Sequence, residues 1–389
     1  MNSNKNLNSL VWPTIFSKKE NILSKFKQYN IKTYALGDPK TLPDIQCLKD
    51  GNYVVWNGGT SWSQSAWNDT IELTTPGWVS PAVIDNRDLE STCWLEDTPK
   101  FSGNVSWPEY CKSDIKSNPE VIKLDGRYAG FHTWWSHNYG HILHDALPYL
   151  LWFREQLPED CQFLLLEDPV AQQIIHNIDQ CLYNNITWLK RGQVASIHGE
   201  LYTTSPIEHP FIKVLEFQSC FKDWLVQSHD GGEPTDIIYH TRSGTTNRRL
   251  LDPHHETQII QTIKRLMVDH NIKGDLKIFT GKNEDDQTLS VEEQINIFKN
   301  AHTVIGPHSS GLINILYSNL NKVKLLEFIP SEECAEVQAP FNSYYHLIPA
   351  LGIDHSILLY TDNSVSERTF INLTDLEDAL NTMWKSKYT

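Results

Sequence analysis

The sequence predicts an α/β protein whose later part is built on a parallel sheet. From about residue 127, short apolar runs alternate with stretches of helical spacing. Strands that alternate with helices of this length form parallel sheets with crossover connections. Residues 31–125 have a different texture, rich in Trp, Gly, Pro, Thr and Asn, which indicates short strands and turns. The length of 389 residues suits two domains or one large α/β enzyme.

The first α/β stretch contains one clear strand and one clear helix. Residues 163–166 form an apolar run typical of a buried strand, and residues 171–182 follow with helical spacing. The stretch 228–234, Ser-His-Asp-Gly-Gly-Glu-Pro, predicts a linker. A second α/β stretch begins after it.

The second α/β stretch alternates regularly. Strands are predicted at residues 236–241, 276–280, 303–305 and 323–328. Asp252 and Pro253 predict the N-cap and first position of one helix, and Ser290 with Glu293 predicts a capping box that opens another. A short helix is expected at residues 311–318. The tail is expected to close with a helix from Asp375 to Lys385.

These textures divide the chain into four parts. Residues 1–125 are expected to form a leader with a Trp-rich β segment, and residues 126–230 a first Rossmann-like domain. Residues 235–350 are expected to form a second Rossmann-like domain, and residues 351–389 a closing tail.

Composition and charge exclude several classes of protein. Hydrophobic residues make up 40% and charged residues 21%, which is a globular balance. The net charge of −15 argues against general affinity for nucleic acid or anionic membranes, because both need basic patches. Seven cysteines without a C-x-x-C pair predict reduced thiols and a cytoplasmic location. No export segment or membrane-spanning run is expected, since a spanning helix needs about 20 apolar residues.

A polar stripe is predicted on the helix that follows residue 136. At helical spacing, Asn138, His141 and Asp145 fall on one face, while leucines occupy the opposite face. His144 lies beside this stripe, and Trp135 precedes it. A carboxylate next to a histidine is an arrangement for general-base chemistry, because the neighbour orients the base and sets its pKa. A solvated helix face with one i, i+4 pair is the alternative.

A metal site is a third interpretation of the same segment. His141, His144 and Asp145 could ligate zinc or manganese, which would make the protein a metal-dependent hydrolase. The zincin motif H-E-x-x-H is absent from the sequence, so no metal is assigned.

The loop Gly306-Pro-His-Ser-Ser-Gly311 joins a predicted strand to a predicted helix. Glycines let the backbone approach a ligand, and Ser309 or Ser310 can cap the helix. The N–H groups at a helix start favour an anion such as phosphate. The pattern is neither a Walker A motif nor G-x-G-x-x-G, so it does not support a nucleoside triphosphatase or a nicotinamide enzyme. An ordinary strand-to-helix turn is the alternative.

Charged side chains lie at or beyond the ends of the predicted strands. They are Arg242, Arg248, Arg249, Lys282, His308 and Glu327. Ligands of open parallel sheets bind outside the carboxyl ends of the strands. In a chain of charge −15, arginines at that edge suit a diphosphate, which a guanidinium binds in bidentate fashion. Glu327 could accept hydrogen bonds from ribose hydroxyls.

Five segments together resemble glycosyltransferase family 61. They are Asn138-x-x-His141-x-x-x-Asp145-x-Leu147-Pro148; Arg242 with Arg248/Arg249 and Glu256; Ser290-x-x-Glu293-Gln294-x-x-x-Phe298-x-x-Ala301; Val304-Ile-Gly-Pro-His-Ser-Ser-Gly-Leu-Ile-Asn314; and Leu326-Glu327-Phe-Ile-Pro330. The family includes plant β-1,2-xylosyltransferases, the EGF-domain O-linked N-acetylglucosamine transferase and bacterial proteins of capsule and lipopolysaccharide synthesis. The resemblance covers roughly residues 127–332.

The resemblance implies an inverting transferase of GT-B type, with two facing Rossmann-like domains and a nucleotide-sugar donor, UDP-linked by expectation. The implied donor site comprises the phosphate-binding Arg242, Arg248 and Arg249, the loop residues His308, Ser309, Ser310, Gly311 and Asn314, Lys282, and Glu327 near the ribose. The implied catalytic residues are Asp145 as general base, with His141 supporting it. Asn138, His144 and Trp135 would lie on the acceptor side.

The resemblance also bears on cofactors, partners and the place of action. A GT-B site can neutralise a diphosphate with arginines and a helix terminus, so no cofactor is required, although Mn²⁺ or Mg²⁺ stays an option. The expected partners are a nucleotide-sugar and a glycan acceptor. An enzyme of bacterial or viral type that builds a surface polysaccharide from the cytoplasmic side fits best, with peripheral membrane association open. A non-catalytic carbohydrate-binding protein that uses the Trp-rich region is the remaining alternative.

Overall fold

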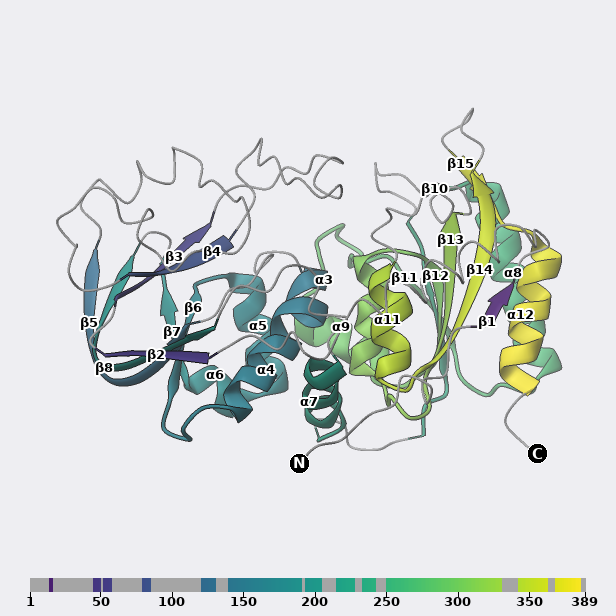
Figure 1. Cartoon of the computed structure of the whole chain (residues 1–389). Helices are drawn as coiled ribbons and strands as arrows, with labels where there is room; N and C mark the ends of the chain where they lie inside the picture. The colour runs from purple at the N-terminus through teal and green to yellow at the C-terminus, as the bar shows by residue number, and fades with distance from the viewer. Residues whose placement is uncertain are drawn as a thin grey trace. The chain divides into compact units, whose positions relative to one another are not determined.

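The structure is a computed structural model of the whole chain. It describes residues 14–16, 45–49, 52–57, 79–84, 120–130, 139–190, 193–204, 215–227, 233–242, 250–330, 342–362 and 368–385. The chain forms two compact units (Figure 1). The N-terminal unit comprises residues 39–217, and the C-terminal unit comprises residues 1–38 with 218–389. Both units combine a β-sheet with helices, which confirms the α/β prediction.

The C-terminal unit contains one eight-stranded sheet. Its strands are β1 (Thr14–Phe16), β9 (Asp236–His240), β10 (Leu250–Leu251), β11 (Leu276–Phe279), β12 (Ala301–Pro307), β13 (Lys324–Pro330), β14 (Asp354–Asp362) and β15 (Arg368–Phe370). The helices of this unit are α8 (Pro253–Asp269), α9 (Val291–Phe298), the 3₁₀ helix η7 (Ser310–Tyr317), α11 (Asn342–Ala350) and α12 (Leu373–Lys385). The helix α7 (Leu215–Gln227) contains the boundary between the units.

The order of this sheet reverses between two neighbouring strands. The strands run β10-β15-β14-β13-β12-β9-β11, and β1 pairs with β14. The pairing is parallel except between β14 and β15. After β9 the chain forms β10 at the far edge of the sheet, then β11 on one side of β9, and then β12 on the other side of β9. Ligands of such open sheets bind at the point of reversal, outside the carboxyl ends of the strands.

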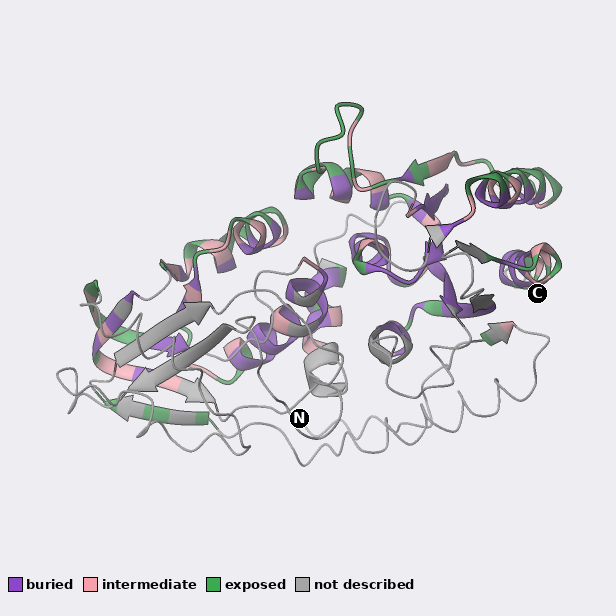
Figure 2. Ribbon diagram, turned by 90° about the horizontal axis from the view of Figure 1, so that it is seen from above, coloured by how far each residue is buried: buried purple, intermediate pink, exposed green. Residues whose placement is uncertain are grey.

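The core of the C-terminal unit lies on both sides of this sheet. All five residues of β9 are buried, as a central parallel strand covered on both faces requires. The helix α8 buries Ile259, Ile263 and Leu266 along one face, at the helical spacing predicted from the sequence. In Figure 2, where the ribbon is coloured by burial, buried residues alternate with exposed ones along the helix next to the C-terminus, α12.

The predicted helix starts are confirmed, whereas one predicted helix has a different form. The Asp252 carboxylate accepts hydrogen bonds from the backbone N–H groups of His254 and His255 at the start of α8. Ser290 and Glu293 form the predicted capping box of α9. The helix expected at residues 311–318 is instead the 3₁₀ helix η7, which has i→i+3 hydrogen bonds.

The N-terminal unit contains a seven-stranded mixed sheet. Its strands are β2 (Ile45–Lys49), β3 (Asn52–Asn57), β4 (Val79–Ile84), β5 (Val121–Gly130), β6 (Gln162–Leu166), β7 (Ile186–Leu189) and β8 (Val194–Thr204). Its helices are α3 (Tyr139–His141), the π-helix η5 (Ile142–Ala146), α4 (Leu147–Glu155), α5 (Pro169–Ile178) and α6 (Gln180–Asn184).

The strands of the N-terminal unit are parallel in one half of the sheet and antiparallel in the other. The order is β4-β3-β8-β5-β6-β7, with β2 also on β8. Strands β5 to β8 pair in parallel, while β2, β3 and β4 pair antiparallel. The short strands predicted in residues 31–125 therefore extend the sheet of the following α/β stretch. The predicted helical stretch 171–182 is divided at Asp179, which is extended and caps α6.

Two glycines face each other across the longest strand pair of this sheet. Gly126 in β5 and Gly199 in β8 are register partners with φ values of 121° and 140°. Glycine adopts this backbone conformation at no steric cost, unlike other residues. A Cβ atom on Gly199 would lie 2.2 Å from the carbonyl oxygen of Gly126. The two strands can therefore approach at this point only because Gly199 has no side chain.

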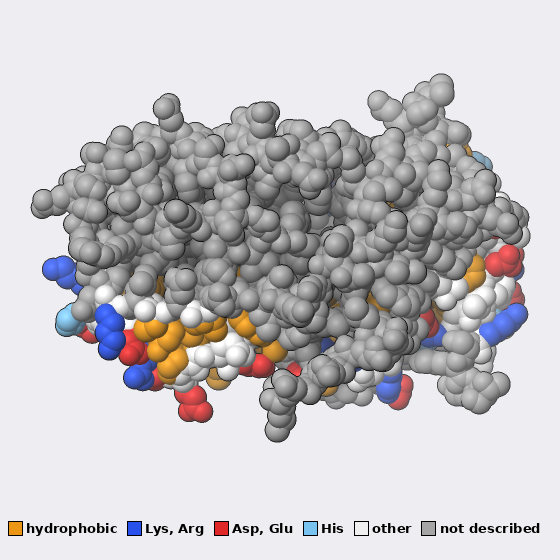
Figure 3. Space-filling model, viewed as in Figure 1, with side chains coloured by type: hydrophobic (Ala, Val, Ile, Leu, Met, Phe, Trp, Pro, Cys, Tyr) orange, Lys and Arg blue, Asp and Glu red, His pale blue; other side chains and the backbone are white. Residues whose placement is uncertain are grey.

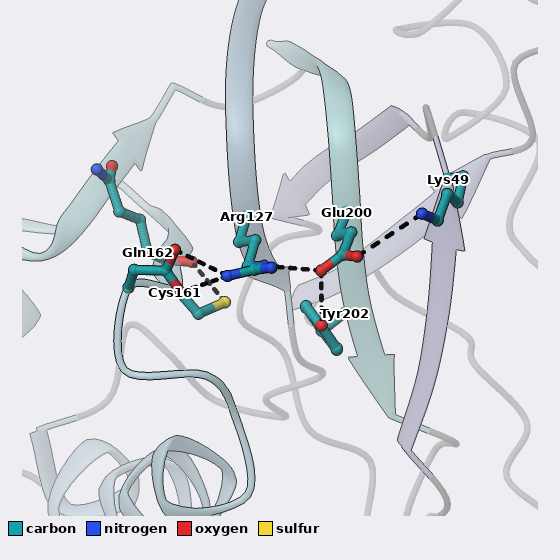
Figure 4. Close-up of polar contacts among 7 residues, drawn as sticks. Lys49, Arg127, Cys161, Gln162, Glu200 and Tyr202 are labelled. Atoms are coloured by element: carbon teal, nitrogen blue, oxygen red, sulfur yellow. Dashed lines mark hydrogen bonds and ion pairs between the residues drawn. The ribbon is translucent and has the colours of Figure 1, made fainter.

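An ion-pair network follows directly after the glycine pair (Figure 4). Arg127 donates to Glu200 at 2.8 Å and to Asp160 at 2.9 Å, and the Tyr202 hydroxyl donates to Glu200 at 2.8 Å. The hydrogen bond from Tyr202 and the ion pair with Arg127 lower the pKa of Glu200. Lys49 in β2 lies 3.8 Å from the same carboxylate. Because these groups are largely exposed, each pair adds little stability, but together they link β2, β5 and β8.

The coloured surface in Figure 3 carries basic and acidic side chains next to one another. This mixed pattern agrees with the pairing of Arg127 and Arg265 to carboxylates. Among the helices that the structure describes, none is long and apolar enough to cross a membrane.

Candidate functional site

An arginine and a histidine lie at the point where the sheet of the C-terminal unit reverses. Arg242 lies two residues beyond the end of β9, and His308 lies directly beyond the end of β12. The Arg242 Nη1 atom is 3.5 Å from the carbonyl oxygen of His308. β9 and β12 are paired in parallel, so their carboxyl ends lie at the same edge. The structure thus brings together two residues that are 66 positions apart in the chain.

A serine and a histidine also bridge these two strand ends. The Ser309 Oγ atom lies 2.6 Å from His240 Nε2, and His240 Nδ1 lies 3.2 Å from the carbonyl oxygen of Phe279. A carbonyl oxygen only accepts hydrogen bonds, so the imidazole proton is on Nδ1 and the Ser309 hydroxyl donates to Nε2. Ser309 therefore fixes the loop to β9. The sequence had suggested that its side chain could cap the following helix, but it makes no capping hydrogen bond.

Gly311 makes room for the His240 ring. A Cβ atom on Gly311 would lie 2.6 Å from Cε1 of that ring, which is closer than real Cβ contacts occur. The glycine is therefore required here for close packing of the loop on β9. The predicted approach of a ligand to the backbone of this loop stays a prediction.

A buried carboxylate lies beneath His308. Glu327, in the middle of β13, has a side chain with 0% exposure. Its Oε1 atom accepts a hydrogen bond from His308 Nδ1, and its Oε2 atom lies 2.9 Å from His355 Nε2 in β14. Burial alone raises the pKa of Glu327, but the charge of His308 and the hydrogen bonds from both imidazoles bring it to about 2. Both oxygens of Glu327 are thus occupied by imidazoles, so the structure does not present this carboxylate to a ribose.

Tyr344 holds the other side of the His308 ring. The two ring centroids are 4.9 Å apart, and the Tyr344 hydroxyl donates to the Ser309 carbonyl at 2.9 Å. α11 therefore fixes both the ring and the backbone of the loop. A preorganised loop of this kind loses little entropy when it binds an anion.

Three other predicted donor residues have partners within the protein. Lys282 Nζ lies 2.7 Å from Asp286 in an exposed ion pair. Asn314 is fully buried and donates to Gln294 at 2.8 Å. Ser310 is exposed at the start of η7. Asn314 therefore anchors η7 to α9, and of these three only Ser310 and Lys282 lie at the surface.

The predicted catalytic helix is continuous but irregular. Residues 139–155 form α3, η5 and α4 in succession, with π-helical geometry at Ile142–Ala146. Pro148 has no N–H to donate to the preceding turn, and the wider π turn precedes it directly. The equal angular steps assumed for the polar stripe therefore do not hold across this segment. The leucines of the opposite face are buried, as predicted. His144, which was predicted to lie beside the polar stripe, is also buried.

Several predicted residues lie outside the described part of the chain. They are Trp135, Asn138, Arg248 and Arg249, and for His141 and Asp145 only the backbone is described. Their roles stay predictions.

Three residues of this site were not singled out in the sequence. His240, His355 and Tyr344 contact Ser309, Glu327 and His308 respectively. His240 ends a predicted strand beside Arg242, which is a signal that could have been used. His355 and Tyr344 come from β14 and α11, elements that the sequence analysis did not predict.

His240 gives the site a measurable pH dependence. Burial and, to a smaller extent, the charge of Arg242 lower the pKa of His240 to about 4, although the hydrogen bond to Phe279 opposes the decrease. The unfolded chain binds a proton near pH 6.5 and the folded chain only near pH 4, so stability falls as pH decreases through this range. We expect a loss of about 3 kcal/mol between pH 6.5 and pH 4, measured by urea unfolding. His240→Gln should remove most of this loss, whereas His254→Gln, at an exposed histidine, should retain it; equal losses in both variants would contradict the assignment.

Among the residues that the structure describes, no group of three or more His, Cys, Asp or Glu side chains is placed to hold a metal ion. The alternative metal set His141, His144 and Asp145 includes two side chains that are outside the described part.

Comparison with known proteins supports the family resemblance. Residues 139–325 match the family model described as Glycosyltransferase 61, which confirms the resemblance found in the sequence. No curated protein matches the chain. Among solved structures, the E. coli heptosyltransferase WaaC with ADP is similar at 10% identity and a TM-score of 0.37, over 66% of this chain and 99% of that one. That likeness is too weak to add to the family match.

Proposed function

We infer that this chain, whose residues 139–325 form a glycosyltransferase 61 domain, transfers a sugar from a nucleotide-sugar to a hydroxyl of a glycan. The family match supports glycosyl transfer in general. The meeting of Arg242 and His308 at the β9–β12 edge supports a donor site in the C-terminal unit. Ligands bind at this edge of open α/β sheets, and cations there suit a diphosphate.

The proposed donor is a UDP-sugar held by its diphosphate. Arg242 would bind the phosphates, together with Arg248 or Arg249 from the segment after β9. Ser310 lies at the start of η7, where N–H groups favour an anion. The proposal needs no metal, because these groups can balance the diphosphate charge. Whether activity depends on Mn²⁺ or Mg²⁺ is tested by measuring it in the presence of a chelator.

The proposed reaction inverts the configuration at the anomeric carbon. Asp145, supported by His141, takes the proton of the acceptor hydroxyl as its oxygen attacks the sugar. The bond between the anomeric carbon and the diphosphate oxygen breaks, and its electron pair stays on that oxygen. Cationic groups at the donor site stabilise this developing charge, and such electrostatic stabilisation is commonly the largest contribution to catalysis. Asn138, His144 and Trp135 are proposed to contact the acceptor, in a GT-B arrangement that acts in the cytoplasm.

Arg242→Ala is expected to weaken UDP binding about 10-fold or more, because a charge-assisted hydrogen bond to phosphate contributes roughly 1.5–3 kcal/mol. Isothermal titration calorimetry measures the affinity. Arg265→Ala is the matched control, since it also removes an arginine, but an exposed one on α8 that is paired with Asp269 and Glu377. Equal affinity of Arg242→Ala and the wild type would remove Arg242 from the donor site.

The nucleotide itself is identified by a thermal-shift screen with UDP, GDP, CMP and their sugars. Stabilisation by a nucleotide and release of that nucleotide in the presence of an acceptor would support the proposal. A protein that binds glycans but is stabilised by no nucleotide would instead be a carbohydrate-binding protein.

A further inference from the structure

The buried carboxylate Glu327 needs a positive partner. Its side chain is fully buried in the middle of β13, between β12 and β14. A carboxylate in such a place is unstable unless a cation compensates it. Among the described residues, the groups that contact it are the imidazoles of His308 and His355. At least one of these rings must therefore be protonated if Glu327 is ionised.

The two rings are not equivalent. The His355 side chain has 0% exposure, and its Nδ1 atom is buried with no hydrogen-bond partner among the described residues. A proton on that atom would leave a buried donor unsatisfied, which costs roughly 1–3 kcal/mol. A neutral His355 avoids this cost, because it needs only the proton on Nε2 that it donates to Glu327. The positive charge therefore belongs on His308, whose side chain is 10% exposed.

Resting on the proposed function, we propose that Glu327 and His355 keep His308 as an imidazolium that donates a hydrogen bond to the leaving diphosphate. His308 Nδ1 is bonded to Glu327, so Nε2 is the ring nitrogen that faces away from the carboxylate. Tyr344 packs on the ring and fixes this orientation. In the reaction, the electron pair of the broken bond stays on the diphosphate oxygen, and His308 stabilises it through its N–H. Glu327 and His355 are positioning residues, because they act through His308.

Other charged or titratable groups around His308 are compatible with this charge. Arg242 approaches the backbone carbonyl of His308 and not its ring. The Tyr344 ring of α11 lies against the His308 ring at an interplanar angle of 49°, and an aromatic ring near a cation is compatible with its charge. His240 of β9 bonds Ser309 and is kept neutral by burial, since its pKa falls to about 4. The hydrogen bond to the carboxylate of Glu327 thus pairs this ring with a buried negative charge.

The direct test is a histidine-labelled NMR titration of the ligand-free protein, with the His308 signal identified by its loss in His308→Asn. The proposal expects His308 to remain an imidazolium at pH 8 in the wild type and to become neutral above about pH 6.5 in Glu327→Gln. Glu256→Gln is the matched control, because Glu256 is also a buried carboxylate but is bonded by the hydroxyls of Tyr239 and Thr241. A wild-type His308 that is neutral at pH 8 would overturn the proposal, and this measurement does not require Glu327→Gln to fold.

The kinetic test separates this charge from a purely structural role. Glu327→Gln should lower kcat by about 10²–10³-fold at pH 8, as loss of one oxyanion donor does, and should recover activity toward pH 6 as His308 is protonated by solvent. A loss of kcat that is equal at every pH would refute the positioning role. The NMR titration needs no nucleotide, so a charged His308 in a protein that binds no nucleoside diphosphate would uphold this inference and refute the proposed function.

Discussion

Asp145→Asn is expected to reduce turnover by about 10²–10⁴-fold, which is the usual contribution of a general base. Asparagine has nearly the same shape as aspartate but cannot accept a proton from the acceptor hydroxyl. The affinity for UDP should not change, because Asp145 is assigned to the acceptor and not to the donor diphosphate. Steady-state kinetics with saturating donor, together with calorimetric titration of UDP, measures both quantities.

The control for this prediction is Glu155→Gln, which neutralises an exposed carboxylate at the end of α4. It should leave turnover within about twofold, as surface substitutions generally do. Unchanged turnover of Asp145→Asn would remove Asp145 from the role of base. Turnover and UDP affinity that fall together would instead indicate a disturbed helix, and circular dichroism would then show a change.

Gly199→Ala is expected to have the largest effect on stability. Its φ of 140° is strained for any residue with a Cβ atom, and that atom would lie 2.2 Å from the Gly126 carbonyl oxygen in the neighbouring strand. The backbone strain costs about 1–3 kcal/mol, and separation of β5 from β8 adds to it. We expect a total of ~4 kcal/mol or more, which lowers the Tm of a unit of this size by roughly 8–16 °C.

Gly126→Ala separates the two causes. Its φ of 121° carries a similar backbone strain, but a Cβ atom there would meet no atom within 4 Å. This variant should therefore lose about 1–3 kcal/mol, from backbone strain alone. Differential scanning calorimetry of both variants measures the difference. Equal losses would show that the strands are free to separate at Gly199 and that close packing is not what requires a glycine.

The sequence predicted the local features of the C-terminal unit well. Strands, helix starts and the capping box at Ser290 depend on neighbouring residues, so they can be deduced from spacing and residue type. The buried face of the helix after residue 136 was predicted for the same reason. The family resemblance also depended on short segments in a fixed order, and the match to residues 139–325 confirms it.

Predictions that assumed regular geometry were less accurate. The π turn at Ile142–Ala146 and the 3₁₀ form of η7 change which side chains share a face, although the sequence pattern is compatible with a regular helix. In both cases the backbone hydrogen bonds span a different number of residues: five in the π turn and three in the 3₁₀ helix, instead of the four of an α-helix. These helix types differ little in energy. Packing and residues such as Pro148, and not the spacing of apolar residues, therefore decide which type forms.

The sequence by itself determined the α/β class, the resemblance to a glycosyltransferase family and the presence of cations at the ends of strands. Only the tertiary structure decided what those residues contact: it paired Arg242 with the His308 loop, joined His240 to Ser309 and enclosed Glu327 between two imidazoles. The reason is that pairing between parallel strands brings together residues that are distant in the chain. The charge of a buried carboxylate or imidazole depends on those neighbours and on the exclusion of water, neither of which is encoded in local spacing.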